Sequence, residues 1–187
     1  MFILYAVLIG LAIGVLAGGR PLALGDIRFR WGGLIVLGFL SQILLFSPAV
    51  SSQIGDLGPW LYVGSTLLVG AAVLRNIGLP GMPIIGLGAL SNVAAILANG
   101  GYMPSTEGAL SAVGKTAPTV YSNSALVPDP ALAPLIDRFA LPAWLPLANV
   151  FSIGDVLIGV GVVVLIVAVM RRAPSGSASA PAGAPVH

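Results

Sequence analysis

The stretch SIGDVLIGVGVVVLIVAVM, Ser152–Met170, decides the fold class. It is apolar apart from Ser152 and Asp155, and a helix needs about 20 mostly apolar residues to cross a hydrocarbon core of about 30 Å. In lipid, such a stretch satisfies its backbone groups by forming a helix. Four other runs have the same character, namely Phe2–Ala17, Gly32–Val50, Pro59–Leu74 and Pro83–Asn99. We therefore predict an all-α fold, an integral membrane bundle of five transmembrane helices at about residues 2–17, 32–50, 59–74, 83–99 and 152–170.

The composition favours lipid as the surrounding solvent. The chain is 57% hydrophobic and 7% charged, whereas a soluble domain carries about 25% charged residues. The few Lys and Arg residues are scattered and form no basic face, which excludes nucleic acid as a partner. There is no cysteine, and the only histidine, His187, ends the chain. We therefore expect no metal and no cofactor.

The distribution of positive charge predicts the orientation of the bundle. Lys115 and Arg138 lie on one side of the predicted helices, and six arginines lie on the other. The six are Arg20, Arg28, Arg30, Arg75, Arg171 and Arg172. Positively charged connections stay in the cytoplasm, so we predict a multi-pass membrane protein with the six-arginine side in the cytoplasm. Its N-terminus would lie outside and its C-terminus in the cytoplasm, with the lipid bilayer as its first partner.

Residues 1–170 are expected to form a single transmembrane domain, with residues 100–150 as an outer-side loop cap. Pro134 is expected to start a short helix in this loop, because proline suits the first turn. Leu135, Ile136 and Phe139 would then share one face. Residues 171–187 are rich in Ala, Pro, Gly and Ser. They are expected to be a disordered cytoplasmic tail, since they cannot bury a core.

The motif NGGYMP, Asn99–Pro104, ends the fourth apolar run. Asn99 and Gly100 are typical of a helix C-terminus, where glycine adopts a left-handed conformation. Tyr102 is expected at the level of the lipid headgroups, and Pro104 prevents the helix from resuming. A further hypothesis is that the bare backbone at Gly100 and Gly101 takes part in binding.

Asn92 lies near the middle of the fourth run, seven residues before Asn99 and on the same helix face. An amide in hydrocarbon needs a hydrogen-bond partner. Interhelical packing is the first interpretation, and a polar patch that holds a ligand is the alternative. The expected partners on neighbouring helices are Ser41, Gln42, Ser65 and Thr66.

The motif FSIGD, Phe151–Asp155, opens the last run. Ser152 and Asp155 have the spacing of a capping box, with Ser152 as the N-cap. This structural role accounts for both residues. Asp155 would nevertheless sit about one turn deep, and an ionisable group inside a membrane is a functional candidate. Arg138 and Lys115 are the cations expected on its side of the membrane.

Two acids in this region form a candidate catalytic pair. Asp137, in LIDR, lies eighteen residues before Asp155, and two close carboxyl groups can share a proton and activate water. The segment weakly resembles the end of the lipoprotein signal peptidases, which are intramembrane aspartyl enzymes with N-x-x-D-R and F-N-x-x-D elements. The first element would need asparagine where this chain has Pro134, and Asn149 lies six residues before Asp155.

A second resemblance covers nearly the whole chain. The hairpin GGRPLALGDIRFRW between the first two runs, NGGYMP after the fourth and NVFSIGDVLIGVG at the start of the last resemble an uncharacterised family of bacterial multi-pass membrane proteins. That resemblance implies a small multi-pass protein of a bacterial inner (plasma) membrane and implies no activity.

These observations support three functional hypotheses. The first is a non-enzymatic accessory or scaffold component of a larger membrane complex, with other membrane protein subunits as partners. The second is an intramembrane aspartyl hydrolase that uses Asp137 and Asp155. The third is a binder or transporter of a small molecule or lipid. The candidate binding residues are Asn92, Asn99, Gly100, Gly101, Tyr102, Ser152, Asp155 and Arg138.

Overall fold

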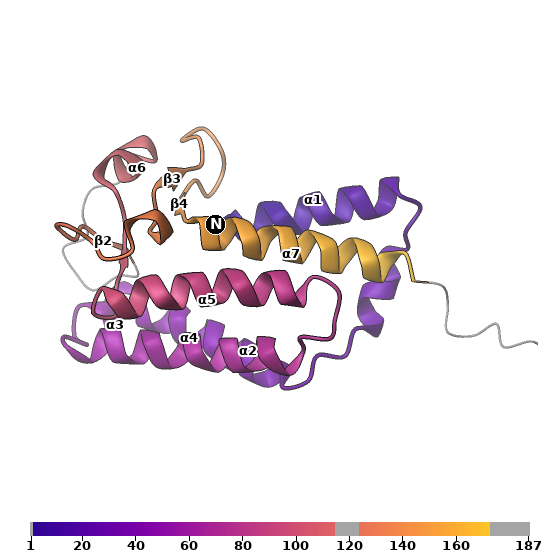
Figure 1. The fold of residues 1–187 in the computed structure, drawn as a ribbon, viewed down its shortest axis with the longest axis horizontal. Coiled ribbons are helices and arrows are strands. Elements are labelled where there is room, and N and C mark those ends of the chain that lie inside the picture. The colour runs from indigo at the N-terminus through magenta and orange to yellow at the C-terminus, as the bar shows by residue number, and fades with distance from the viewer. Residues whose placement is uncertain (1, 115–123, 173–187) are drawn as a thin grey trace, which may run out of the picture.

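The computed structural model describes residues 2–114 and 124–172 and is mostly helical (Figure 1). The five apolar runs fold as helices. They are α1 (Phe2–Leu16), α2 (Gly32–Leu45), α4 (Leu57–Arg75), α5 (Met82–Ala98) and α7 (Ile153–Met170). Within the described residues, α4 and α7 are long and apolar enough to cross a membrane, and the other three are shorter apolar helices. Lys115 and the tail beyond Arg172 lie outside the described residues.

The second run does not form one helix over residues 32–50. α2 ends at Leu45, and the short helix α3 (Pro48–Ser51) begins with a proline. Proline has no N–H and its ring clashes with the preceding turn, so it cannot continue a helix but can start one. The hydroxyl group of Ser47 donates to the carbonyl oxygen of Leu44 and satisfies part of the α2 terminus.

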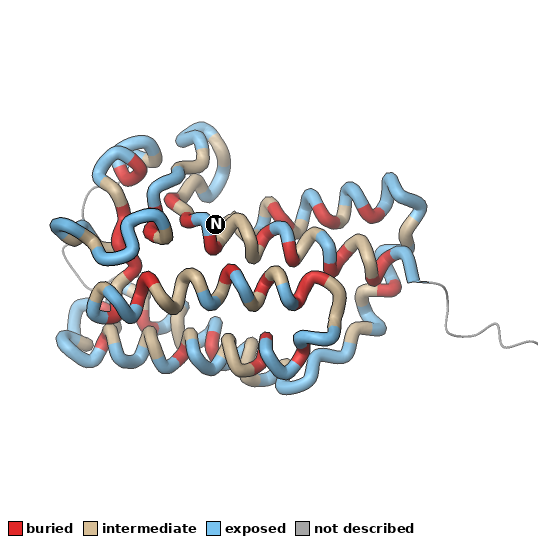
Figure 2. Tube along the Cα trace, viewed as in Figure 1, coloured by how far each residue is buried: buried red, intermediate tan, exposed pale blue. Residues whose placement is uncertain are grey.

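The helices are arranged as two packed groups. α7 lies between α1 and α5, while α2 packs on α4. Contact between the groups, along α4 and α5, is less extensive. Figure 2 shows buried positions along α5 and α7 and exposed positions on the outer sides of the helices.

Glycines bring α5 and α7 into backbone contact. A Cβ atom at Gly88 would lie 2.4 Å from the carbonyl oxygen of Gly154, and one at Gly161 would lie 2.7 Å from that of Gly81. Small residues allow membrane helices to approach in this way.

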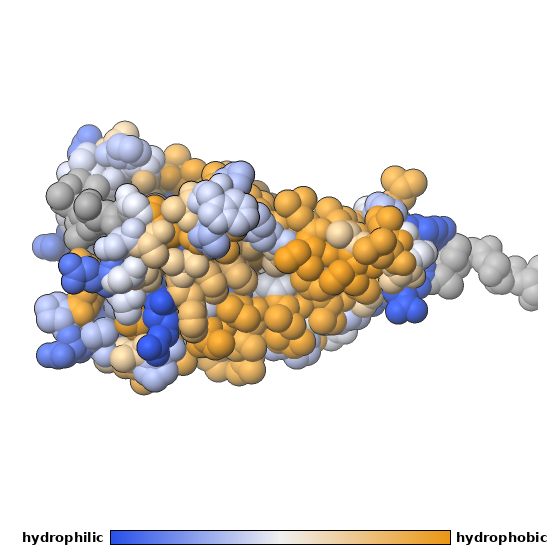
Figure 3. All heavy atoms as spheres, turned by 90° about the horizontal axis from the view of Figure 1, so that it is seen from above, coloured by the Kyte–Doolittle hydropathy of each residue, from blue (hydrophilic) through white to orange (hydrophobic). Residues whose placement is uncertain are grey.

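Apolar side chains cover the outside of the bundle. Leu8 on α1 and Ile43 and Leu44 on α2 are each more than 60% exposed. Figure 3 shows this apolar surface as a band between two more polar ends of the molecule. A patch of this extent is typical of a surface that contacts a membrane or another protein.

The polar end that carries residues 99–114 and 124–152, called here the cap end, contains small strands that the all-α prediction did not include. β1 (Met103–Pro104) pairs in parallel with β2 (Ser124–Ala125). β3 (Phe139–Ala140) pairs in antiparallel fashion with β4 (Val150–Phe151), which leads directly into α7. A short helix, α6 (Glu107–Ala112), lies between β1 and β2 in sequence.

The helix expected at Pro134 is only a single 3₁₀ turn, η2 (Ala133–Leu135). Ile136 is already extended, with φ −77° and ψ 173°. Asp137 then forms a parallel bridge with Ser105. Backbone pairing therefore replaces the helical turn that would have placed Leu135, Ile136 and Phe139 on one face.

Candidate functional site

Three polar side chains from α5 and α7 form a closed hydrogen-bonded cluster at the cap end. Ser152 and Asp155 form the predicted capping box, in which the Asp155 N–H donates to Ser152 Oγ (3.1 Å) and the Ser152 N–H donates to Asp155 Oδ2 (3.0 Å). Asn92 joins them from α5. Its Nδ2 donates to Asp155 Oδ1 (2.8 Å), and its Oδ1 accepts from Ser152 Oγ (2.9 Å). Both oxygens of the Asp155 carboxyl group therefore accept a hydrogen bond.

Gly154 makes this cluster possible. A Cβ atom at this position would lie 1.9 Å from Asn92 Oδ1 and 2.8 Å from the carbonyl oxygen of Gly88. Only glycine leaves room for the Asn92 amide to reach the first turn of α7. The motif FSIGD thus supplies the cap, the acid and the space for the amide.

The partners expected for Asn92 were wrong. The polar groups of α2 and α4 bind one another, because Gln42 Nε2 donates to Ser65 Oγ (3.2 Å) and to Thr66 Oγ1 (3.3 Å). Ser41 Oγ donates to the carbonyl oxygen of Gly38 in its own helix. The polar side chains of α2 and α4 therefore bind within their own group of helices and leave Asn92 to α7.

The cations expected for Asp155 are not its partners among the described residues. Arg138 is exposed, and no ion pair joins it to Asp137 or Asp155 within ranges 2–114 and 124–172. Lys115 lies outside these ranges. The Asn92 amide and the Ser152 backbone stabilise Asp155 in place of a positive charge.

Asp137 is held beside this cluster by backbone pairing. Its N–H donates to the carbonyl oxygen of Pro104 (2.9 Å), and its carbonyl oxygen accepts from the N–H of Thr106 (3.0 Å). The β3–β4 hairpin, which begins just after Asp137, pairs Phe139 with Phe151, and β4 leads into α7. The hairpin therefore brings Asp137 to the first turn of α7.

The two carboxyl groups interact. Asp137 is 6% exposed, and burial, together with the negative charge of Asp155, raises the pKa of Asp137 from 3.8 to about 7. Burial disfavours the charged form of a carboxyl group, and a nearby like charge does the same. Near neutral pH, Asp137 is therefore close to half protonated and can either donate or accept a proton.

Ser105 adds a buried hydroxyl group that sequence reasoning missed. It is 4% exposed, and its Oγ has no hydrogen-bond partner among the residues that the structure describes. Ser105 is the bridge partner of Asp137, which places the two residues side by side in the cap. Only its position directly after NGGYMP could have drawn attention to it in the sequence.

The NGGYMP residues have a separate role. α5 ends at Ala98, and both Gly100 and Gly101 have positive φ, as expected for a helix stop. Asn99 binds the cap, since its Nδ2 donates to the carbonyl oxygen of Ala131 (2.9 Å) and its Oδ1 accepts from the N–H of Ala131 (2.9 Å). Tyr102 is half-buried next to β1. Asn92 and Asn99 therefore bind different segments and do not form one polar patch.

Metal ligands do not gather in the described part of the chain. Residues 2–114 and 124–172 contain no group of three or more His, Cys, Asp or Glu side chains that could hold a metal ion. The arrangement at the cap end therefore offers carboxyl, amide and hydroxyl groups, which can exchange protons and form hydrogen bonds.

The fold and the site together define a mostly helical protein with a small cap that contains strands. The cap end carries two acids whose charges interact, the buried Asp137 and the half-buried Asp155. The chain belongs to DUF5317, a family of unknown function, which matches it over residues 26–167. The match includes Asn92, Ser105, Asp137 and Asp155. Comparison with curated proteins found no match, and comparison with solved structures found none.

Proposed function

We propose that this DUF5317 protein is embedded in a membrane with its five apolar helices crossing the bilayer and its cap on the outer side. The length and composition of α4 and α7 support this placement. The apolar band between the two polar ends supports it independently (Figure 3). The Asp137–Asp155 pair would then lie at the outer boundary of the hydrocarbon core.

At this boundary we propose an intramembrane aspartyl hydrolase that cleaves an amide bond. The observation that supports this proposal most strongly is the buried Asp137 carboxyl group, whose pKa is raised to about 7 beside Asp155. Two carboxyl groups in different environments can divide the roles of acid and base between them. Asp155 is oriented by Asn92 and Ser152, whereas the described residues make no hydrogen bond to the carboxyl group of Asp137.

The proposed reaction assigns one role to each acid. Asp155 accepts a proton from water as the water oxygen forms a bond to the amide carbon, and Asp137 gives its proton to the carbonyl oxygen. When the carbon–nitrogen bond breaks, the proton on Asp155 passes to the leaving nitrogen and Asp137 recovers its own. Asn92 and Ser152 act by positioning Asp155. General acid–base assistance of this kind contributes about 10²–10⁴-fold to a rate.

The test uses the full chain in liposomes together with detergent-extracted membrane polypeptides from its own organism. New N-termini are identified by mass spectrometry after incubation. The wild-type protein is expected to produce new termini, and both Asp137→Asn and Asp155→Asn are expected to lower their yield at least a hundredfold. Asp129→Asn is the control, because Asp129 is an exposed acid in the same cap and asparagine tolerates its positive φ of 46°.

The acid pair predicts a particular pH profile as well. Cleavage should fall as pH rises through about 7, because Asp137 then loses the proton it must donate. Failure of the wild-type protein to cleave, or cleavage that survives both substitutions, would rule out the hydrolase.

One observation favours the accessory or scaffold role. The Ser152–Asp155 capping box and the Asn92 contact would be sufficient reasons for these residues in a purely structural protein. Under that role, Asp155→Asn lowers stability, the wild-type protein cleaves nothing, and mild detergent extraction recovers larger partners. The binder or transporter hypothesis expected a cavity shared by Asn92, Asn99 and Asp155, and the structure brings only Asn92 and Asp155 together.

A further inference from the structure

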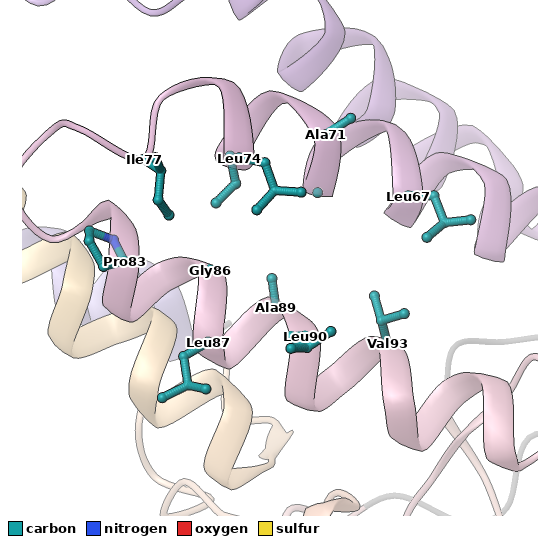
Figure 4. Close-up of a pocket in the computed structure, with 12 residues that line it drawn as sticks. Leu67, Ala71, Leu74, Ile77, Pro83, Gly86, Leu87, Ala89, Leu90 and Val93 are labelled. Carbon is teal, nitrogen blue, oxygen red and sulfur yellow. The ribbon is translucent and has the colours of Figure 1, made fainter.

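A hollow in the bundle lies between α4 and α5. It has a volume of about 500 Å³. Figure 4 shows Leu67, Ala71 and Leu74 of α4 on one side and Gly86, Ala89 and Leu90 of α5 on the other. All of its lining residues are apolar, and glycine and alanine in the middle leave the space that larger side chains would fill.

Each wall of the groove is held by a different neighbour. α5 is in backbone contact with α7 through Gly88 and Gly154. α4 is held to α2 by the hydrogen bonds of Gln42 and by Gly38, where an added Cβ atom would lie 3.2 Å from the carbonyl oxygen of Ser65. Each wall therefore belongs to its own packed pair of helices, and the groove lies where the two pairs meet.

The shape and lining of the groove favour a hydrocarbon chain. Along α5, from Pro83 to Val93, the wall is about 15 Å long at 1.5 Å per residue. Water is excluded, since a buried water needs two to four polar partners and the lining supplies no polar side chain.

Charge at one end of the groove identifies the kind of lipid. Leu74 and Ile77, which line the groove, flank Arg75 in sequence. Arg75 is exposed, and its Cζ lies 6.0 Å from the ring centroid of Trp31. The Asn76 side chain accepts from the N–H of Arg30 (2.8 Å) and donates to the carbonyl oxygen of Arg30 (2.7 Å). These two hydrogen bonds hold a second arginine near Arg75. No ion pair neutralises either arginine within the described residues.

We propose that the α4–α5 groove binds one acyl chain of an anionic phospholipid whose phosphate lies on Arg75. The acyl chain fills the apolar hollow, and the exposed guanidinium group at its end binds the headgroup. Each arginine near a membrane surface favours anionic lipid by about fivefold. This site is independent of the carboxyl pair, so its test does not depend on any hydrolytic activity.

The test is native mass spectrometry of the full chain extracted from nanodiscs that contain equal amounts of phosphatidylglycerol and phosphatidylcholine with identical acyl chains. The wild-type protein is expected to retain one lipid, with about a fivefold preference for phosphatidylglycerol. Gly70→Leu should lower retention of both lipids about tenfold, because its side chain would enter the groove. Gly64→Leu is the matched control on the same helix, since an added Cβ at either glycine meets nothing within 4 Å and Gly64 does not line the groove.

A second pair of variants tests the headgroup contact. Arg75→Gln should abolish the preference for phosphatidylglycerol and leave phosphatidylcholine retention unchanged. Arg172→Gln removes the same charge at the end of α7 and should keep the preference. Equal retention by Gly64→Leu and Gly70→Leu, equal binding of the two lipids by the wild-type protein, or a copurifying protein partner that is lost on Gly70→Leu would each overturn the proposal.

Discussion

Asp137 is a buried acid of the cap, 6% exposed. Burial disfavours its charged form, and the nearby charge of Asp155 adds to that effect. A neutral side chain of the same shape would be more stable at this position.

The raised pKa of Asp137 predicts how stability depends on pH. Between the unfolded value of 3.8 and the folded value of about 7, the folded state binds more protons than the unfolded state. Stability is therefore greatest below pH 4 for this group and falls as pH rises through 7. This rise in the pKa of Asp137 corresponds to a loss of roughly 4 kcal/mol in the free energy of unfolding above pH 7.

Asp137→Asn should remove this dependence and raise the free energy of unfolding above pH 7. The measurement is the thermal unfolding midpoint of the detergent-solubilised protein at intervals from pH 4.5 to 8.5. Asp129→Asn, which changes an exposed acid, should leave the wild-type slope unchanged. A wild-type slope that persists in Asp137→Asn would show that another group titrates.

At the scale of single elements, local signals were the most predictable part of the structure. The capping box of α7 and the glycine stop of α5 both follow from residues within one turn of the helix end. Contacts between elements could not be predicted in this way. Asn92 was expected to bind α2 or α4. It binds Asp155 instead, because α5 approaches α7 closely at Gly154.

Two N-caps of the described residues have a side-chain hydrogen bond, and they allow a local cap to be compared with a cap that also joins two helices. Ser152 Oγ accepts from the Asp155 N–H and also donates to Asn92, whereas Thr106 Oγ1 accepts from the Ala109 N–H and binds no other described residue. Loss of a cap costs about 1 kcal/mol, and a buried group left without its partner costs about 1–3 kcal/mol more.

Ser152→Ala should therefore destabilise the protein by roughly 2–4 kcal/mol, and Thr106→Ala by about 1 kcal/mol. Equilibrium unfolding followed by circular dichroism would compare the two variants. Equal losses would mean that the hydrogen bond between Ser152 and Asn92 contributes nothing to stability.

At the scale of the whole molecule, the length of the apolar runs located the helices, and this signal missed the strands of the cap. The strands are only two residues long and pair across sequence separations that no local pattern encodes. For the same reason, the sequence could suggest that Asp137 lies close to Asp155 but could not establish it. The proposed orientation of the bundle also depends on the whole molecule, since the connections 17–31 and 76–81 and the end of α7 lie together opposite the cap.

The absence of cysteine from the chain makes this orientation easy to test. Gly108→Cys in α6 and Gly25→Cys in η1 (Pro21–Asp26) place single thiols at opposite ends of the bundle, and an added Cβ meets nothing within 4 Å at either site. An impermeant maleimide applied to intact cells should label Gly108→Cys and should label Gly25→Cys only after the membrane is opened. The reverse pattern would place the arginines outside.

The β3–β4 hairpin has a consequence for how the protein would respond to its surroundings. One short ribbon of chain carries Asp137 at one edge and continues into the turn that carries Asp155. Membrane helices tilt when bilayer thickness changes, and such tilting would carry both acids along together. The distance between the two carboxyl groups would then not depend on lipid composition, even though the tilt of the helices does.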